Sequence, residues 1–483
     1  MRRHRLLVLG MVCSIAGCNM APAYHIPLAS LPGSYKEAGQ WQTVQPQDSL
    51  SRGPWWQRFN DPTLNRLVPE LENSNPDLAA AVARYDQARA FAAEAEAGLY
   101  PQVFAAATFS ENSPSANRPL RGTTQPSTFG ANQIAGAAQY EIDLWGQLRN
   151  EASAGKSLAQ ASAADLATMN LSLEAELASD YFVLRGLDAD DKLLTDTVDA
   201  FQRALDLTEN LLAGKLASGA DVSRAQTQID MARAMVSDIV SRRALMEHAI
   251  ASLVGEPATS FSLPPQIIPF DLPAIPTGMP ATLLQRRPDI ASAERMMNAA
   301  NAQVGIARAA YYPALTLTAL GGFQSTDLNL LSLPNSVWSI GPNLQLPLFE
   351  GGRLHAQEAA AYGRYRETTA SYRSTVLTAL QQVEDNLALL HWLGQESVDE
   401  EAGVKAAQHT LDIALNLYKQ GITSYLEVVT AQTALLQAQQ SSIDLQARRL
   451  TADVGLIRAL GGGWDTSQLP TTAETLKLPA AKT

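Results

Sequence analysis

Apolar residues recur about every 3.5 positions through a long segment of the second half of the chain. Within residues 353–419 they are Val376, Leu380, Val383, Leu387, Leu390, Val398, Val404, Leu411, Leu415 and Tyr418. Because this is the period of a coiled-coil seam, we predict a single helix over 353–419, a break near 419–424 and a second helix to Leu460. At 1.5 Å per residue the first helix would be about 100 Å long. The pattern therefore indicates an elongated fold.

Two shorter segments alternate with a period of two, which predicts β-hairpins over 101–144 and 313–348. The apolar positions of the first strand are Val103, Ala105, Ala107 and Phe109, and those of the last strand are Trp338, Ile340, Leu344 and Leu346. A soluble sandwich has the same alternation, but four strands are too few for a sandwich core. A sheet that spans a membrane must close, and three chains would supply twelve strands. We therefore predict a transmembrane β-barrel completed by trimerisation.

The chain is duplicated. Residues 75–79 and 99–101 recur 212 positions later, and residues 218–226 recur 206 positions later. We predict two repeats, 75–255 and 288–460, each with a helix, a hairpin, a long helix, a turn and a helix, with the turns near 214–220 and 419–424. A Pro-rich crossover, 256–287, joins them. The predicted fold class is α+β, with a long α-helical barrel coaxial with the β-barrel.

The first residues predict a secreted chain. A basic start and an apolar run over 6–16 are typical of a signal peptide. The following Ile15-Ala16-Gly17-Cys18 resembles a bacterial lipobox, which predicts cleavage after residue 17 and a lipid on Cys18. Asn19 in place of Asp favours sorting to the outer membrane. The alternative is a plain signal peptide in which Cys18 is incidental. Cys13 would leave with the signal, so no disulfide is expected.

The remaining composition adds few chemical candidates. A formal net charge of −12 argues against a nucleic-acid partner. The six histidines are scattered, and we find no phosphate-binding loop or nucleophile elbow, so we predict no enzyme, metal or cofactor beyond the lipid. The acidic run at 188–191 lacks the spacing of a calcium loop, and we interpret it as a solvated patch. Residues 18–74 are predicted to form an N-terminal anchor and equatorial segment, and residues 461–483 a C-terminal tail.

Four motifs together identify a family. They are Pro54-Trp55-Trp56-Gln57-Arg58-Phe59-Asn60-Asp61-Pro62-Thr63-Leu64, Leu284-Gln285-Arg286-Arg287-Pro288-Asp289-Ile290, Tyr312-Pro313-Ala314-Leu315 and Ala459-Leu460-Gly461-Gly462-Gly463-Trp464. They resemble the TolC-like outer-membrane factors, in particular the OprM/NodT-type efflux lipoproteins. The resemblance implies a homotrimeric channel-tunnel in the outer membrane of a Gram-negative bacterium. It would extend into the periplasm and dock on a periplasmic adaptor (membrane fusion) protein and an inner-membrane pump, commonly of the resistance-nodulation-division type.

The resemblance favours export of drugs or other toxic small molecules. Metal-ion efflux and type I protein secretion use the same architecture and remain alternatives. A periplasmic adaptor lipoprotein is a further alternative, but its usual lipoyl and β-barrel modules have no counterpart in this sequence. The methionines have no spacing that suggests a copper or silver relay, so we assign them to packing.

The resemblance also implies a gate at the two helix breaks. Asp221 and Tyr418 match a linking pair of the family, and Glu427 matches a constricting acidic position. The family often has a basic residue where this chain has Thr423, and an Asp where it has Thr430. A ring of three Glu427 side chains would favour cations. The alternative is that Asp221 and Glu427 only cap their helices.

Overall fold

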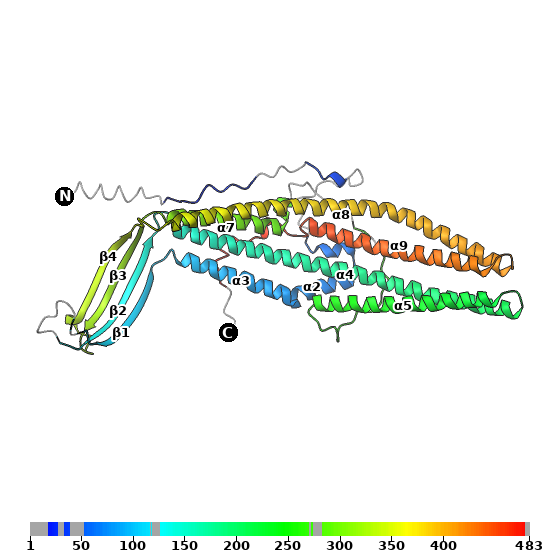
Figure 1. Cartoon of the computed structure of the whole chain (residues 1–483), viewed down its shortest axis with the longest axis horizontal. Helices are drawn as coiled ribbons and strands as arrows, with labels where there is room; N and C mark the ends of the chain where they lie inside the picture. Colours follow the sequence, from blue (N-terminus) through cyan, green and yellow to red (C-terminus); the bar gives the residue numbers. More distant parts are fainter. Residues whose placement is uncertain are drawn as a thin grey trace.

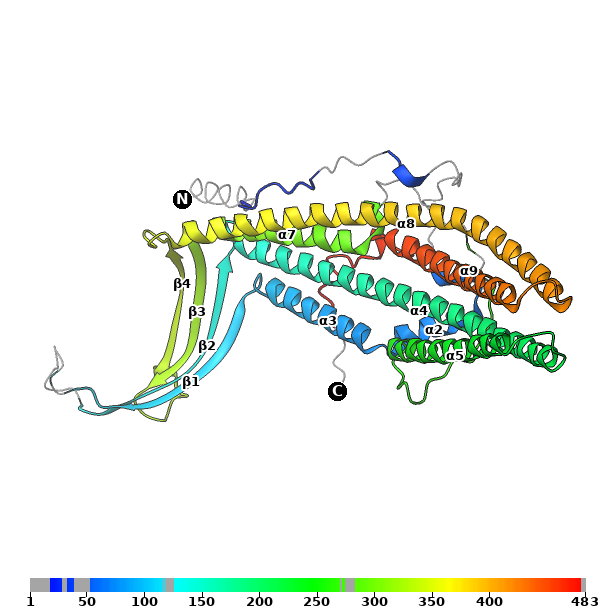
Figure 2. The same cartoon turned by 45° about the vertical axis from the view of Figure 1, so that its right-hand side comes forward.

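The computed structural model describes residues 18–27, 33–38, 53–115, 117, 126–269, 272–273 and 283–478. The described chain is elongated, with its strands at one end and, at the other, the two turns that connect successive helices, at 214–218 and 420–424 (Figure 1). Between them the helices run nearly parallel to the long axis (Figure 2). The predicted signal peptide, 1–17, lies outside the described residues, as do parts of the first hairpin loop and of the crossover.

Corresponding helices of the two repeats have equal lengths. α3 and α7 have 22 residues each, α4 and α8 have 67, and α5 and α9 have 35. The bounds are α3 Pro76–Ala97, α4 Gln147–Ala213, α5 Gly219–Leu253, α7 Pro288–Ala309, α8 Arg353–Lys419 and α9 Tyr425–Ala459. α3 and α7 begin at a proline, whose missing N–H costs nothing in the first turn. α8 spans the range that the apolar period predicted, and α4 ends at the predicted break near 214–220.

The short elements belong mostly to the middle of the molecule. They are α2 (Pro62–Ser74), α6 (Leu283–Arg286) and the 3-10 helices η1 (Lys36–Ala38), η2 (Trp55–Phe59), η4 (Leu333–Asn335) and η5 (Thr466–Gln468). η2 and α2 pack on α4 through Trp55, Leu64 and Leu67. This equatorial core also takes the α8 seam residues Val376, Val383 and Leu387. Val398, predicted for the same seam, is 65% exposed.

The four strands form one antiparallel sheet in the order β1-β2-β3-β4. Their bounds are β1 Gln102–Asn112, β2 Phe129–Ile142, β3 Ala314–Ser325 and β4 Ser336–Gln345. Val103 pairs with Ala138, and Tyr140 pairs with Leu317, so the apolar positions share one face as predicted. β1 and β4 are the outer strands of this open sheet. Of the residues that follow β4, Leu348 and Phe349 are each 90% exposed.

Each hairpin leads into its long helix through a left-handed glycine. Gly146 precedes α4 with φ +79°, and Gly352 precedes α8 with φ +89°. A side chain is strained in this conformation, so glycine is favoured where the chain leaves the sheet. Within the described residues, no helix combines the length and apolar character needed to cross a membrane.

Candidate functional site at the helix tips and the chain start

The turn between α4 and α5 is closed by a capping box. The Asp221 N–H donates to Ser218 Oγ (3.2 Å), and the Asp221 carboxylate accepts from the Ser218 N–H (3.0 Å). Arg224 lies 3.2 Å from the same carboxylate. Partial burial opposes the shift, but the Ser218 hydrogen bonds and the Arg224 charge lower the pKa of Asp221. The carboxylate therefore stabilises the first turn of α5.

Tyr418 lies against α4 rather than at the turn between α4 and α5. Its hydroxyl donates to Thr208 Oγ1 (3.4 Å), and both side chains are buried. Its ring centroid is 5.2 Å from that of Tyr425, the first residue of α9. Asp221 is thus hydrogen-bonded to Ser218 and Arg224, and Tyr418 is hydrogen-bonded to Thr208. The linking pair implied by the family is not formed between these two side chains within the described chain.

Tyr425 lies at the turn between α8 and α9, and the Asp221 carboxylate affects its pKa. Its ring is buried, and its hydroxyl has no hydrogen-bond partner among the described residues. Burial, followed by the nearby Tyr418 and the Asp221 carboxylate, raises the pKa of Tyr425 to about 12. Tyr425 is not among the gate residues predicted from the sequence. Its spacing of three from the buried Val428 was the available signal that it faces the helix cluster.

The other predicted gate residues lie near the start of α9. Glu427 and Thr430 are exposed, and Thr423 is partly buried. The Thr430 hydroxyl donates to the carbonyl of Leu426 (2.9 Å). Ser424, the residue before α9, makes no side-chain cap, so Glu427 in the first turn interacts favourably with the helix dipole but is not part of a capping box. Its carboxylate is free to face solvent.

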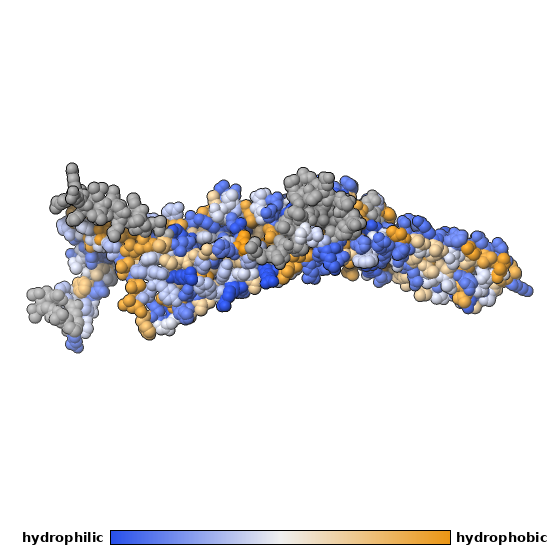
Figure 3. Space-filling model, turned by 90° about the horizontal axis from the view of Figure 1, so that it is seen from above, coloured by the Kyte–Doolittle hydropathy of each residue, from blue (hydrophilic) through white to orange (hydrophobic). Residues whose placement is uncertain are grey.

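Both turns expose apolar side chains. Leu216 is 77% exposed and Ile422 is 66% exposed, and the adjoining helix ends add Leu212, Leu417 and Leu426. Figure 3 shows apolar surface at the end of the molecule opposite the strands. A soluble tip has no need of such residues at its extremity, so the tip is a candidate contact surface.

The first described residues lie along α7. The carbonyl of Cys18 accepts from Arg149 Nη2 (3.2 Å), and Asn19 Oδ1 accepts from Asn150 Nδ2 (2.9 Å). Further along, the carbonyl of Pro22 accepts from Asn301 of α7 (2.9 Å). These contacts hold the exposed Cys18 beside the start of α4, next to the junction of the sheet and the helices. Cys18 is thus on the strand side of the molecule.

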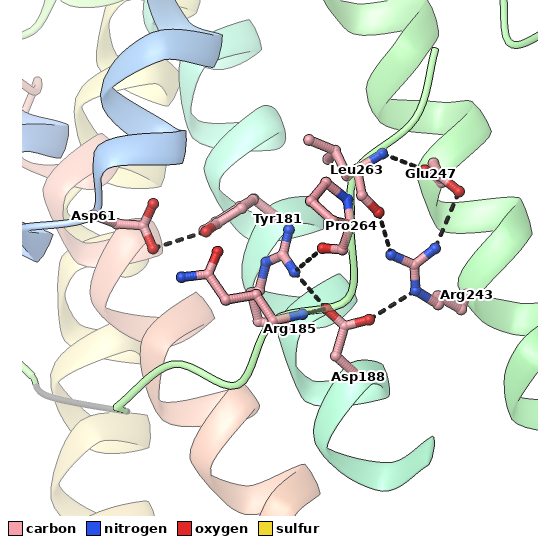
Figure 4. Close-up of polar contacts among 9 residues, drawn as sticks. Asp61, Tyr181, Arg185, Asp188, Arg243, Glu247, Leu263 and Pro264 are labelled. Atoms are coloured by element: carbon pink, nitrogen blue, oxygen red, sulfur yellow. Dashed lines mark hydrogen bonds and ion pairs between the residues drawn. The ribbon is translucent and has the colours of Figure 1, made fainter. Parts of the chain in front are cut away.

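A buried ion network lies at the equator and corrects one interpretation. Asp188 is not in a solvated patch: its side chain is fully buried and contacts Arg185 and Arg243, with Arg243 Nε at 2.7 Å (Figure 4). It also accepts from the N–H of Gln266 (3.0 Å) in the crossover. Arg243 reaches Glu247 (3.1 Å) on α5. Burial depends on a segment far along the chain, so local sequence did not reveal it.

The same network fastens the crossover to the helices. Arg243 Nη2 donates to the carbonyl of Leu263 (2.5 Å), and Glu247 accepts from the Leu263 N–H. Arg185 donates to the carbonyl of Pro264 (3.0 Å). Nearby, the Tyr181 hydroxyl donates to Asp61 (2.7 Å), the residue that caps α2 (Figure 4). The equator is therefore tied together by charged hydrogen bonds across four segments.

A second buried carboxyl lies beside η2. Trp55 Nε1 donates to Glu174 (2.7 Å), and Asn170 Nδ2 donates to its other oxygen (2.5 Å). Burial, assisted by the charge of Glu72, raises the pKa of Glu174 to about 7 despite these hydrogen bonds. The carboxyl borders a cavity of about 380 Å³. No group of three or more potential metal ligands gathers here or elsewhere in the described segments.

Comparison with known proteins assigns the chain. The family model described as "Outer membrane efflux protein" matches residues 67–256 and 279–462. The probable efflux pump outer membrane protein TtgC of Pseudomonas putida is 31% identical over 93% of this chain and 93% of its own length. The pyoverdine export outer membrane protein OpmQ of Pseudomonas aeruginosa is 30% identical over 94% of this chain and 97% of its own.

A solved structure agrees with these relatives. The outer membrane protein VceC of Vibrio cholerae superposes with a TM-score of 0.80 at 31% identity, over 87% of this chain and all of that chain. The residues matched by the family model include both repeats and the four strands, so the predicted fold class and the recognised family are confirmed. The chain belongs to the outer membrane efflux protein family.

Proposed function

We propose that three copies of this chain form the outer-membrane duct of a tripartite efflux assembly. The observation that carries the proposal is a four-stranded sheet with two open edges, continued by two 67-residue helices of the same direction and length. An open edge exposes unpaired backbone groups, which lipid cannot satisfy. Further copies supply the missing pairs and enclose a lumen.

The helix tips are the proposed docking site for a periplasmic adaptor protein, which links the duct to an inner-membrane pump, favoured to be of the resistance-nodulation-division type. The exposed Leu216 and Ile422 support this role, since apolar residues at an extremity are stabilised when a partner covers them. The adjoining Asp221, Tyr418 and Glu427, with Thr423 and Thr430, form the proposed gate. Neither threonine carries charge, so Glu427 supplies the acidic ring of this gate.

Cys18 is the proposed site of lipid attachment. Its exposed thiol lies at the sheet end of the helices, where an attached acyl chain reaches the membrane without displacing the segment along α7. The anchor adds to membrane insertion of the sheet, since one acyl chain alone gives only weak binding. Labelled palmitate would be incorporated into the wild-type protein and absent from Cys18→Ala.

Small toxic molecules are the proposed cargo. Relatives named for efflux pumps and for pyoverdine export support a small-molecule class. The cation efflux system protein CusC of Escherichia coli, 28% identical over 95% of this chain, keeps metal ions as the second candidate. A deletion strain exposed to dyes, antibiotics, copper and silver separates the two. Sensitivity to dyes and antibiotics that the plasmid-borne gene reverses supports the proposal, whereas sensitivity to metals alone overturns the cargo assignment.

The assembly is tested separately from the cargo. Native mass spectrometry of the detergent-extracted protein is expected to give the mass of three chains. A stable monomer in lipid bilayers would contradict the duct.

A further inference from the structure

The internal duplication predicts how one copy joins the next. The offset of 212 relates α3 to α7, and the offset of 206 relates α4 to α8 and α5 to α9. The strands follow the same offsets. The observed pair Gln102–Gln139 of β1 and β2 becomes Ala314–Gln345 after these shifts, and this is the observed pair of β3 and β4. The two offsets therefore describe helices and strands together.

The joint between the repeats can be carried to the joint between copies. Within the chain, β2 of the first repeat pairs with β3 of the second, for example Ile142 with Leu315 and Ala138 with Ala319. β4 corresponds to β2, and β1 corresponds to β3. Moving Ala138 forward by 206 and Ala319 back by 212 gives Leu344 and Ala107. The same operation on Ile142 and Leu315 gives Leu348 and Val103.

We propose that β4 pairs antiparallel with β1 of the next copy, in the register that sets Leu344 opposite Ala107 and Leu348 opposite Val103. This inference rests on the proposed trimer and deepens it, because it specifies which residues close the sheet. It also extends β4 beyond Gln345, its last residue within one chain, to Leu348.

The side-chain pattern is consistent with this register. Leu344, Leu346 and Leu348 meet Ala107, Ala105 and Val103, so apolar side chains face apolar ones. The alternate positions pair Asn343 with Thr108 and Ser339 with Asn112, so polar side chains face polar ones. A slip by one residue would oppose the two faces, which excludes registers of odd displacement. Registers displaced by two residues keep the same faces together, and the choice among them rests on the two repeat offsets.

The helices supply an independent observation. Within the chain, α4 approaches α9 closely at Gly186, where an added Cβ would lie 3.1 Å from Cβ of Ala447. The corresponding positions between copies are Trp392 of α8 and Ser241 of α5. Trp392 is 65% exposed in one chain, and the exposed Val240 and Leu245 flank Ser241. A large apolar side chain thus faces a small residue with apolar neighbours, which makes this joint wider than the one inside the chain.

Cysteine pairs test the register in membranes. Leu344→Cys with Ala107→Cys is the matched pair, and Leu344→Cys with Ala105→Cys or with Phe109→Cys are same-face controls displaced by two residues. Gln345→Cys with Ala106→Cys tests the adjacent pair, because neighbouring antiparallel pairs alternate in their separation. Single-cysteine variants serve as the background. We expect oxidation to give at least about 10-fold more cross-linked dimer and trimer from a matched pair than from either control, within disulfide geometry.

The outcomes separate the register from the assembly. If a displaced control links better, or if no pair links in a protein of trimer mass, the proposed register is wrong and the trimer stands. If no pair links and the wild-type protein has monomer mass, the proposed duct fails as well. Trp392→Cys with Ser241→Cys tests the helical joint, with Arg233→Cys about two turns away as the control partner. Stronger linking to Arg233→Cys would overturn the helical part.

Discussion

Removal of the Asp188 carboxylate should release the crossover from the equator. Its side chain is fully buried and contacts two guanidinium groups and the N–H of Gln266. In Asp188→Ala, Arg185 and Arg243 keep buried charges without their shared partner, and breaking a buried pair in this way costs about 3–5 kcal/mol. The exposed pair of Lys192 and Asp196 on the same helix is the matched control, since exposed pairs contribute about 0–1 kcal/mol.

Hydrogen exchange of the Gln266 amide measures this loss, because its N–H donates to Asp188. If the cost falls on local opening, exchange should accelerate by roughly 100-fold to 5,000-fold in Asp188→Ala, and by less than about 10-fold in Asp196→Ala. The Tyr181 region, held by Asp61, should change less. Equal exchange of Gln266 in the two variants would refute the assignment of the network as the fastening of the crossover.

Four further predictions concern other parts of the molecule. The pKa of Glu174 is raised from 4.5 to about 7, so the folded state binds this proton more tightly than the unfolded state. This contribution to stability is complete below about pH 4.5 and is lost as the pH rises to about 7. Glu174→Gln should therefore weaken the dependence of the unfolding temperature on pH across that window, and an unchanged dependence would contradict the prediction. Asp221→Ala should cost about 1 kcal/mol through loss of the capping box, seen as faster amide exchange in the first turn of α5 only. Glu427→Gln should reduce cation selectivity in single-channel recordings, and unchanged selectivity would remove the acidic ring. Trp392→Ala should lower the temperature at which the trimer dissociates, whereas the same change at the exposed Leu328, outside the proposed joints, should not.

The repeated helices could be predicted from sequence because their signals are local. The apolar period is regular over 376–390 and again over 411–418 of α8, and prolines open α3 and α7. α2 was missed although its signals were present: Asp61 caps it, Pro62 begins it, and Leu64, Leu67, Val68 and Leu71 recur at helical spacing. Its short length and its place between loop segments concealed it.

The polar equator could not be predicted in this way. Asp188 is buried because the crossover, some 78 residues further along, lies over it, and no local pattern encodes that approach. The gate lies between these cases. The turns fall at the predicted breaks, but Tyr418 turns toward Thr208, and it is Tyr425 whose pKa the Asp221 carboxylate helps to raise. The roles of Tyr418, Glu427, Thr423 and Thr430 stay predictions.

Comparison of the two repeats explains why the duplicated chain needs an asymmetric equator. The offset of 206 carries Arg243 and Glu247 onto Arg449 and Asp453, but it carries Asp188 onto Gly394. Asp453 is buried with one oxygen unpartnered among the described residues, and burial raises its pKa to about 7, against the effect of Arg449. The carboxylate that joins Arg185 and Arg243 in the first repeat therefore has no counterpart at the corresponding position of the second. Arg449 already donates to Ser397 Oγ (3.2 Å), and Gly394→Asp should add a carboxylate partner for it. An ion pair formed there would show that the missing carboxylate, rather than the helix framework, distinguishes the two halves.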